Sequence, residues 1–264
     1  RDAETSQVWL MDRRGGEPFQ LTEMKGPVST FEWSPDSSRL AVIARDPDPD
    51  EASEEEEENG TPKPLVIRRL QFKRDGVGYL KELYRHLYLV EIESSEITPL
   101  TSGPYDHSQP TWSPDGSRIA FVSNRTAEPD ANDNTDIFVI SAEGGEAASL
   151  TRNPGSDHSP AWSPDGSHIA YVTSVKPERI WYATRHLALV DVGSGQSRLL
   201  TRDLDRHVSD PSFDDSGQRI RFLLEDSGNV HLTEFNLASN SLRRIIQGER
   251  VVRRYHEAGG QMVS

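Results

Sequence analysis

Two Asp-His-Ser triplets and a third histidine supply the residue types of an acyl-transfer triad. We take the triplets, 106–108 and 157–159, to stand at equivalent places before a recurring tryptophan, and His207 follows an Asp-Arg pair. A serine nucleophile needs a histidine base and a carboxylate that orients the histidine, so catalysis is one interpretation. Repeated polar residues beside strands more commonly satisfy backbone hydrogen bonds. We therefore expect His107, His158 and His207 to be structural, with the lining of a central channel as the alternative.

The chain lacks the sequence pattern of a serine-hydrolase nucleophile. The pattern G-x-S-x-G, which places a serine on a strained strand-to-helix turn, does not occur. The nearest match, Gly193-Ser194-Gly195, is typical of a hairpin turn between two strands. We expect no catalytic residue in this chain, and no hydrolysis by the chain alone.

Oxygen-rich segments are the candidates for a metal site. Four carboxylates have the spacing of a calcium loop, namely Asp46, Asp48, Asp50 and Glu57. Glu51 stands where the sharp turn of such a loop needs glycine, and the segment 130–136 also lacks that glycine. The eight histidines have no H-x-x-x-H spacing, and there is no cysteine. We expect neither a metal ion nor a cofactor.

An acidic insertion, 46–64, is followed by a basic cluster. Nine carboxylates fall within residues 46–58, and no hydrophobic core can absorb them, so the insertion should be a solvated, mobile loop. The cluster consists of Arg68, Arg69, Lys73 and Arg74. Its simplest role is to balance nearby carboxylates. The alternative is that the insertion and its arginines gate the passage of peptides, as loops often do.

Composition excludes several classes of partner. The 264 residues carry a net charge of −14, with an isoelectric point near 5.0, which argues against nucleic acid and anionic membranes. No run of 18 apolar residues occurs, so we expect no membrane span. The chain begins Arg-Asp-Ala-Glu, without methionine or a signal peptide, so we expect a processed chain or a piece of a longer protein. We expect a cytoplasmic location, with the periplasm as the alternative.

A repeat organises the chain. The motif Trp-Ser-Pro-Asp-Gly follows Thr111 and Ala161, with a variant at 33–37 and a worn copy at 213–217. Ser-Pro-Asp-Gly favours a type I turn, and the apolar run after it predicts a strand that is buried on both faces. The aromatic anchors recur at intervals of 79, 50 and 51 residues, and a Leu-Thr pair precedes each by 12 or 13 residues. We expect these anchors, Trp33, Trp112, Trp162 and Phe213, to lie in the core.

Each repeat contains four short strand patterns. Units of four strands and roughly 40–50 residues predict an all-β fold, a β-propeller of four-stranded antiparallel blades. We place the blades at 8–45, 65–125, 136–175 and 185–225, with a partial blade at 229–264 and a strand at 65–73. Propellers close with about four to eight blades, so four units and a fraction should form an incomplete ring. Its open strand edges should make the chain self-associate, which would give a homo-oligomer.

The repeat resembles those of the Tol–Pal periplasmic propeller protein and of the prolyl oligopeptidase family of serine peptidases. Segments 67–80, 85–90, 121–125, 184–190 and 204–208 look like the bacterial acylaminoacyl-peptidase and dipeptidyl-aminopeptidase branch of that family. The resemblance covers roughly residues 8–250.

The resemblance implies an enzyme of two domains, in which a propeller precedes a C-terminal α/β-hydrolase domain that holds the catalytic triad. That domain is absent from this chain, and it would be the chain's main partner. The propeller would act as a lid and filter that admits short peptides, with Arg68, Arg69, Arg74 and the three histidines as gating or channel-lining residues. The alternative is a non-enzymatic propeller of the Tol–Pal kind that binds proteins, and a freestanding sensor propeller is a third hypothesis.

Overall fold

The computed structural model describes residues 5–48, 66–75, 78–258 and 261–263. In these residues the regular structure is β-strand, apart from two short 3-10 helices, η2 (Pro129–Ala131) and η3 (Pro177–Tyr182). No helix in these ranges is long and apolar enough to cross a membrane.

Four sheets have four antiparallel strands each, in chain order. Blade I consists of β3 (Val28–Trp33), β4 (Arg39–Arg45), β7 (Arg85–Glu91) and β8 (Ile97–Pro99). Blade II consists of β9 (His107–Trp112), β10 (Arg118–Ser123), β11 (Asp136–Ser141) and β12 (Ala148–Ser149). Blade III consists of β13 (Asp157–Trp162), β14 (His168–Ser174), β15 (Arg185–Asp191) and β16 (Ser197–Leu199). Blade IV consists of β17 (Val208–Phe213), β18 (Arg219–Asp226), β19 (Asn229–Asn236) and β20 (Ser241–Ile246).

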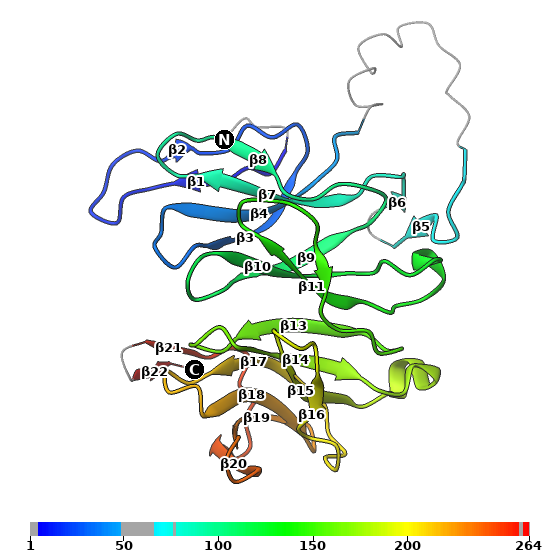
Figure 1. Cartoon of the computed structure of the whole chain (residues 1–264), viewed down its shortest axis with the longest axis vertical. Helices are drawn as coiled ribbons and strands as arrows, with labels where there is room; N and C mark the ends of the chain where they lie inside the picture. The colour runs from blue at the N-terminus through cyan, green and yellow to red at the C-terminus, as the bar shows by residue number, and fades with distance from the viewer. Residues whose placement is uncertain (1–4, 49–65, 76–77, 259–260, 264) are drawn as a thin grey trace, which may run out of the picture.

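Three hairpins of short strands complete the fold. They are β1 (Trp9–Leu10) with β2 (Phe19–Gln20), β5 (Lys73–Arg74) with β6 (Gly78–Tyr79), and β21 (His256–Ala258) with β22 (Gln261–Val263). Figure 1 shows the four blades following one another along the longest axis, with β1–β2 and β21–β22 on the same side. The described residues form an open arc of blades and no closed ring.

The expected fold class is confirmed, but the expected blade boundaries are wrong. Each of the expected units joins strands from different sheets, because the strand that carries the aromatic anchor begins a sheet and does not occupy its middle. The units 8–45, 136–175 and 185–225 contain strands of two sheets, and the unit 65–125 contains strands of three. The intended final unit, 229–264, likewise divides blade IV. The strand expected at 65–73 is also wrong: of its described part, only Lys73 is in a strand, the short β5. The acidic insertion lies outside the described residues except for Asp46-Pro47-Asp48.

The predicted turn and the predicted double-sided strand are both confirmed. The Gly116 N–H donates to the Ser113 carbonyl at 2.9 Å, and the equivalent bond recurs between Gly166 and Ser163. The strand that follows packs on both sides. In β10, Phe121 faces blade I whereas Ala120 faces blade III, and both are fully buried.

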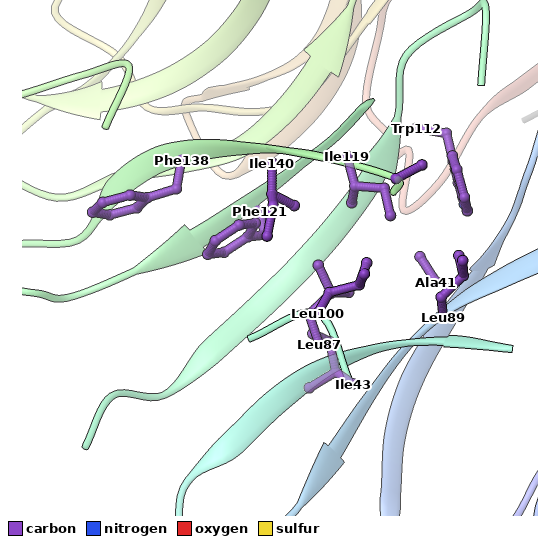
Figure 2. Packing of buried hydrophobic residues seen from close by; sticks show 11 residues of the cluster. Ala41, Ile43, Leu87, Leu89, Leu100, Trp112, Ile119, Phe121, Phe138 and Ile140 are labelled. Atoms are coloured by element: carbon purple, nitrogen blue, oxygen red, sulfur yellow. The ribbon is translucent and has the colours of Figure 1, made fainter. Parts of the chain in front are cut away.

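The hydrophobic core lies in layers between successive blades. Figure 2 shows the layer in which Ile43 and Leu87 of blade I meet Phe121 and Phe138 of blade II. Comparable layers join blades II and III and blades III and IV. Because each layer needs both of its blades, every blade is stabilised chiefly by its neighbours in sequence.

The aromatic anchors follow this rule. Trp112 and Trp162 are 5% and 8% exposed, each covered by the preceding blade. Trp33, however, is 43% exposed, and Phe31 of the same strand is exposed as well. Only the short hairpin β1–β2 precedes blade I among the described residues, so the expectation that Trp33 lies in the core is wrong.

Candidate functional site: two cavities on the loop face

The two ends of the blades differ in their connections. The turns within 34–38, 113–117, 163–167 and 214–218 all lie at one end, because each joins the first strand of a blade to the second. The opposite end, here called the loop face, carries the longer connections between second and third strands. These are 46–84, 124–135 and 175–184, whereas in blade IV this connection is a two-residue turn. The blades of this domain therefore differ from one another most on the loop face.

A cavity of about 630 Å³ on the loop face contains two of the three candidate histidines. His158 and His207 line it together with Arg185 and the polar segment 132–134, and we call it the histidine cavity. The backbone N–H of Arg185 donates to Nδ1 of His207 at 3.2 Å, which leaves Nε2 of His207 to carry the proton of the neutral ring. Burial, with Arg185 nearby, lowers the pKa of His158 to about 4. Near neutral pH this histidine is an uncharged hydrogen-bonding group.

The third histidine is in a different environment. His107 is fully buried, and its Nδ1 lies 2.8 Å from the carbonyl oxygen of Arg85. Arg125 donates to its Nε2 at 3.0 Å. A guanidinium can only donate, so the ring is neutral with its proton on Nδ1. Burial lowers the pKa of His107 to about 4. The expected structural role fits these contacts.

The two triplets do not stand at equivalent places. His107 pairs with Ser123 across blade II, and the residue that takes this position in blade III is Asp157, which pairs with Thr173. His158 is therefore shifted by one residue along its strand. Since side chains alternate between the two sides of a strand, this shift turns His158 toward the other side.

Two features were not predicted from the sequence: the aromatic surroundings of Arg125, and the proximity of Asp136 to Asp157. The guanidinium carbon of Arg125 lies 4.4 Å from the centre of the Phe138 ring, and Tyr105 and Phe121 also flank it. Asp157 is fully buried, and burial raises its pKa. Burial and the nearby Asp157 together raise the pKa of Asp136 to about 6. Asp136 pairs with Ser123 in blade II and Asp157 with Thr173 in blade III, so packing between the two blades brings these carboxylates together, and no local pattern in the sequence could have revealed their proximity.

A second cavity, of about 500 Å³, lies on the loop face of blade I, and we call it the basic cavity. Arg69 and Arg74 line it, as do Arg45, Lys81 and Arg85 from the adjoining segments. Arg68 of the same predicted cluster does not line it: its side chain is 70% exposed and lies 4.0 Å from Glu82.

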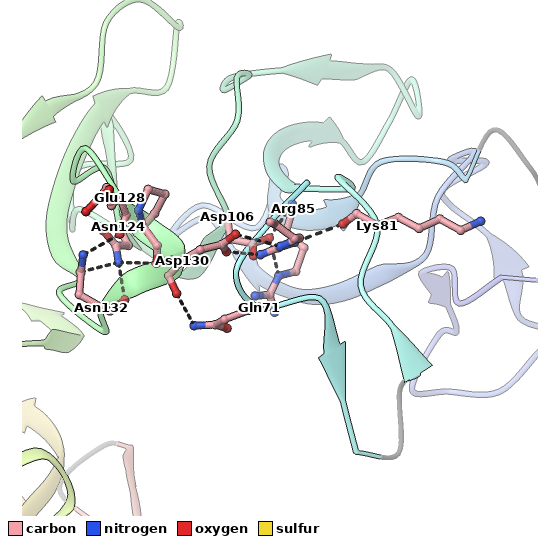
Figure 3. Close-up of polar contacts among 10 residues, drawn as sticks. Gln71, Lys81, Arg85, Asp106, Asn124, Glu128, Asp130 and Asn132 are labelled. Carbon is pink, nitrogen blue, oxygen red and sulfur yellow. Dashed lines mark hydrogen bonds and ion pairs between the residues drawn. The ribbon is translucent and has the colours of Figure 1, made fainter. Parts of the chain in front are cut away.

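A polar network anchors the segment after the acidic insertion, residues 69–71, to blade II. Arg69 donates to Asp130 at 2.6 Å and to the Lys81 carbonyl at 3.2 Å, while Gln71 donates to the carbonyl of Asp130 at 3.1 Å (Figure 3). Asp130 lies in η2 of blade II, so the segment 69–71 that follows the insertion is held against that blade. The charge balance expected for the basic cluster thus applies to Arg69.

The residues with calcium-loop spacing make other contacts. Asp46 accepts a hydrogen bond from the Tyr84 N–H at 3.0 Å, and Asp48 pairs with Lys81 at 2.6 Å. Asp50 and Glu57 lie outside the described residues. Within the ranges that the structure describes, no three His, Asp or Glu side chains are grouped as a metal site would require.

Successive four-stranded antiparallel blades, with their cores between them, define a β-propeller domain. The chain belongs to the family of the acylaminoacyl-peptidase N-terminal β-propeller domain, whose model matches residues 1–263.

Relatives with longer chains agree with this assignment. An uncharacterized peptidase, YuxL of Bacillus subtilis, is 34% identical over 140 residues, which cover 53% of this chain and 21% of that protein. The acylaminoacyl peptidase of Pyrococcus horikoshii superimposes with a TM-score of 0.70 at 17% identity, over 97% of this chain and 37% of that structure. TolB of Acinetobacter baumannii superimposes with a TM-score of 0.51 at 18% identity, over 94% of this chain and 61% of that structure. The chain thus spans well under half the length of both peptidases.

Proposed function

We propose that this chain is the propeller of a serine peptidase, and that it acts as lid and filter for a hydrolase domain outside this sequence. The observation that carries the proposal is the family match over 1–263, in a chain that covers only 37% of the peptidase structure it resembles. The reacting groups would belong to the hydrolase domain, and the propeller would bind and select the substrate. Short, unfolded peptides are the expected substrates.

The loop face supports the filter. It presents the histidine cavity and the basic cavity, and their sizes suit a few peptide residues each. His158 offers an uncharged hydrogen-bonding group and His207 a second imidazole, while Arg185 adds a positive charge. A peptide backbone has both donors and acceptors, so such a lining can guide it without requiring a particular sequence.

The test uses the full-length protein. A fluorophosphonate reagent should label it, and the labelled protein should lose the ability to cleave short peptides. Cleavage should decline as the peptide is lengthened, and a folded protein should remain intact. A protein consisting of residues 1–264 alone should be neither labelled nor active.

Deletion of residues 50–64 from the full-length enzyme tests whether the insertion contributes to gating. If it does, longer peptides should be cleaved faster after the deletion, and an unchanged length profile would contradict that role.

A protein-binding propeller without enzymatic activity is the second candidate, because TolB shares the fold. An unlabelled full-length protein that co-purifies with partner proteins would favour it. The peptidase proposal places the enzyme in the cytoplasm, with the periplasm as the alternative, and cell fractionation distinguishes the two.

A further inference from the structure

The basic cavity stands out electrostatically from the rest of the molecule. The chain carries a net charge of −14, yet five of the side chains that line this cavity are cationic and only two are carboxylates. The cations are Arg45, Arg69, Arg74, Lys81 and Arg85. An acidic protein concentrates positive charge in one cleft at a cost in self-repulsion, which an anionic ligand would relieve.

Three of the five cations are neutralised by carboxylates of this chain. Arg69 pairs with Asp130 at 2.6 Å, and Lys81 pairs with Asp48 at 2.6 Å. Arg85 directs both its backbone N–H and its Nε to one oxygen of Asp106, at 2.9 and 3.1 Å. These pairs fix the walls of the cavity and leave those cations little capacity for a ligand.

Arg45 and Arg74 are the remaining cations. Arg45 is the last residue of β4, and its Nε is buried without a hydrogen-bond partner. Arg74 ends β5, also lines the cavity and is exposed to solvent. Neither side chain has a hydrogen bond or an ion pair with any residue that the structure describes. A partly buried guanidinium without an anion is unfavourable, so this pair is well placed to receive one.

We propose that the basic cavity binds the C-terminal carboxylate of a short peptide through Arg45 and Arg74. A planar guanidinium matches a carboxylate with two parallel hydrogen bonds, which gives both strength and orientation. Tyr79, Leu80 and Leu83 also line the cavity and provide an apolar wall for the last side chain of the peptide. Each peptide has one C-terminal carboxylate. Binding of this group would fix the C-terminal end of the peptide in the cavity and would favour short substrates.

This inference rests on the proposed function, since it assumes that peptides reach the loop face. The experiment measures peptide binding and not turnover, so the carboxylate site and the peptidase function can be refuted separately. The full-length protein is first treated with the fluorophosphonate reagent, and fluorescein-labelled tripeptides are then titrated by anisotropy. Each tripeptide is used as the free acid and as the C-terminal amide.

We expect the free acid to bind about tenfold more tightly than the amide, which corresponds to a difference of about 1.4 kcal/mol. Arg74→Gln should abolish most of this preference, and so should Arg45→Gln. Arg68→Gln is the matched control, because Arg68 lies in the same segment but does not line the cavity. Its preference should equal that of the unmodified protein.

Several outcomes would overturn the inference. Equal binding of acid and amide is one, and an undiminished preference in both Arg45→Gln and Arg74→Gln is another. Competition by inorganic phosphate as strong as that by the peptide acid would show a general anion site. A preference for the acid that arises only after Glu54–Glu58 are all changed to Gln would also overturn it. In that case the cavity of the unmodified protein binds carboxylates of its own chain and not those of a peptide. A protein that escapes fluorophosphonate labelling but still prefers the acid would refute the peptidase proposal and leave the carboxylate site standing.

Discussion

Arg39 of blade I lies over the indole ring of Trp112 in blade II, with its guanidinium carbon 5.1 Å from the ring centre. Its Nη2 also donates to the Gly116 carbonyl at 3.1 Å, and Arg118 repeats both contacts with Trp162 and Gly166 of blade III. In blades I and II, the arginine that follows the turn therefore joins its own blade to the next. The tryptophan before the turn and the glycine within it, which belong to the hairpin motif, thus also hold neighbouring blades together.

The first prediction concerns this contact. Arg39→Ala should lower the free energy of unfolding of the propeller by about 1–2 kcal/mol, because a largely buried cation–π contact and a hydrogen bond to a backbone carbonyl are both lost. Urea denaturation followed by tryptophan fluorescence measures it. Arg14→Ala is the control, since Arg14 is an exposed side chain on the β1–β2 hairpin. Equal stability of the two variants would contradict the prediction.

The second prediction follows from the junction where the pattern changes. His168 takes the arginine position in blade III, and Phe213 takes the tryptophan position in blade IV. The double variant His168→Arg/Phe213→Trp should recreate the contact and be more stable than the sum of the single changes by about 0.5–1 kcal/mol. A double-mutant cycle in urea measures the coupling free energy. Strictly additive effects would show that the geometry at this junction differs from that of the Arg39–Trp112 contact.

The third prediction concerns the dependence of stability on pH. His107 has its pKa lowered to about 4 by burial, whereas the unfolded chain takes up this proton near pH 6.5. Between these values the unfolded state binds more protons, so stability falls as the pH falls through this window. Between pH 7 and pH 5 this residue should account for a loss of about 2 kcal/mol.

His107→Gln isolates the effect, because glutamine keeps a donor for the Arg85 carbonyl and an acceptor for Arg125 but does not titrate. The variant should lose less stability than the unmodified protein between pH 7 and pH 5. The raised pKa of Asp136 affects stability in the opposite direction, and the lowered pKa of His158 affects it in the same direction. Both residues are present in both proteins, so their contributions to the pH dependence cancel in the comparison. Parallel pH profiles would contradict the assigned role of His107.

The fourth prediction tests the close approach of two segments in blade III. A Cβ at Gly155 would lie 1.6 Å from the carbonyl oxygen of Ser174, so Gly155→Ala must displace backbone and should cost about 3 kcal/mol or more. Gly144→Ala is the control: Gly144 has a φ of 88° but no atom within 4 Å of the added Cβ. It should cost only about 1 kcal/mol of backbone strain. Similar losses in both variants would argue against the close approach.

The fifth prediction concerns the uncovered side of blade I. Residues 1–264 expressed alone should self-associate through Phe31 and Trp33, which are 46% and 43% exposed on β3. Light scattering on a sizing column should show oligomers, and Phe31→Ser/Trp33→Ser should shift the population toward the monomer. A monodisperse monomer before any substitution would refute this expectation.

The sequence alone determined the fold class, because the evidence for it is local. A Ser-Pro-Asp-Gly turn and an alternating apolar strand are properties of consecutive residues, and their recurrence at about 50 residues indicates a propeller. The resemblance carried by the connecting segments likewise led to the family. The blade boundaries could not be placed in this way, since a repeat can be divided at any point of its period. Only the pairing of β10 with both β9 and β11, which leaves β9 at the edge, shows where a sheet begins.

The tertiary structure decided which polar residues meet. The triplets at 106–108 and 157–159 contain the same residues and begin six and five residues before their tryptophans, but only the structure shows that this one-residue shift buries His107 and places His158 in a cavity. In the same way, Arg68 and Arg69 are neighbours in sequence, yet only Arg69 reaches Asp130, sixty-one residues away. Side-chain environment depends on register and on packing between blades, which no local sequence pattern encodes.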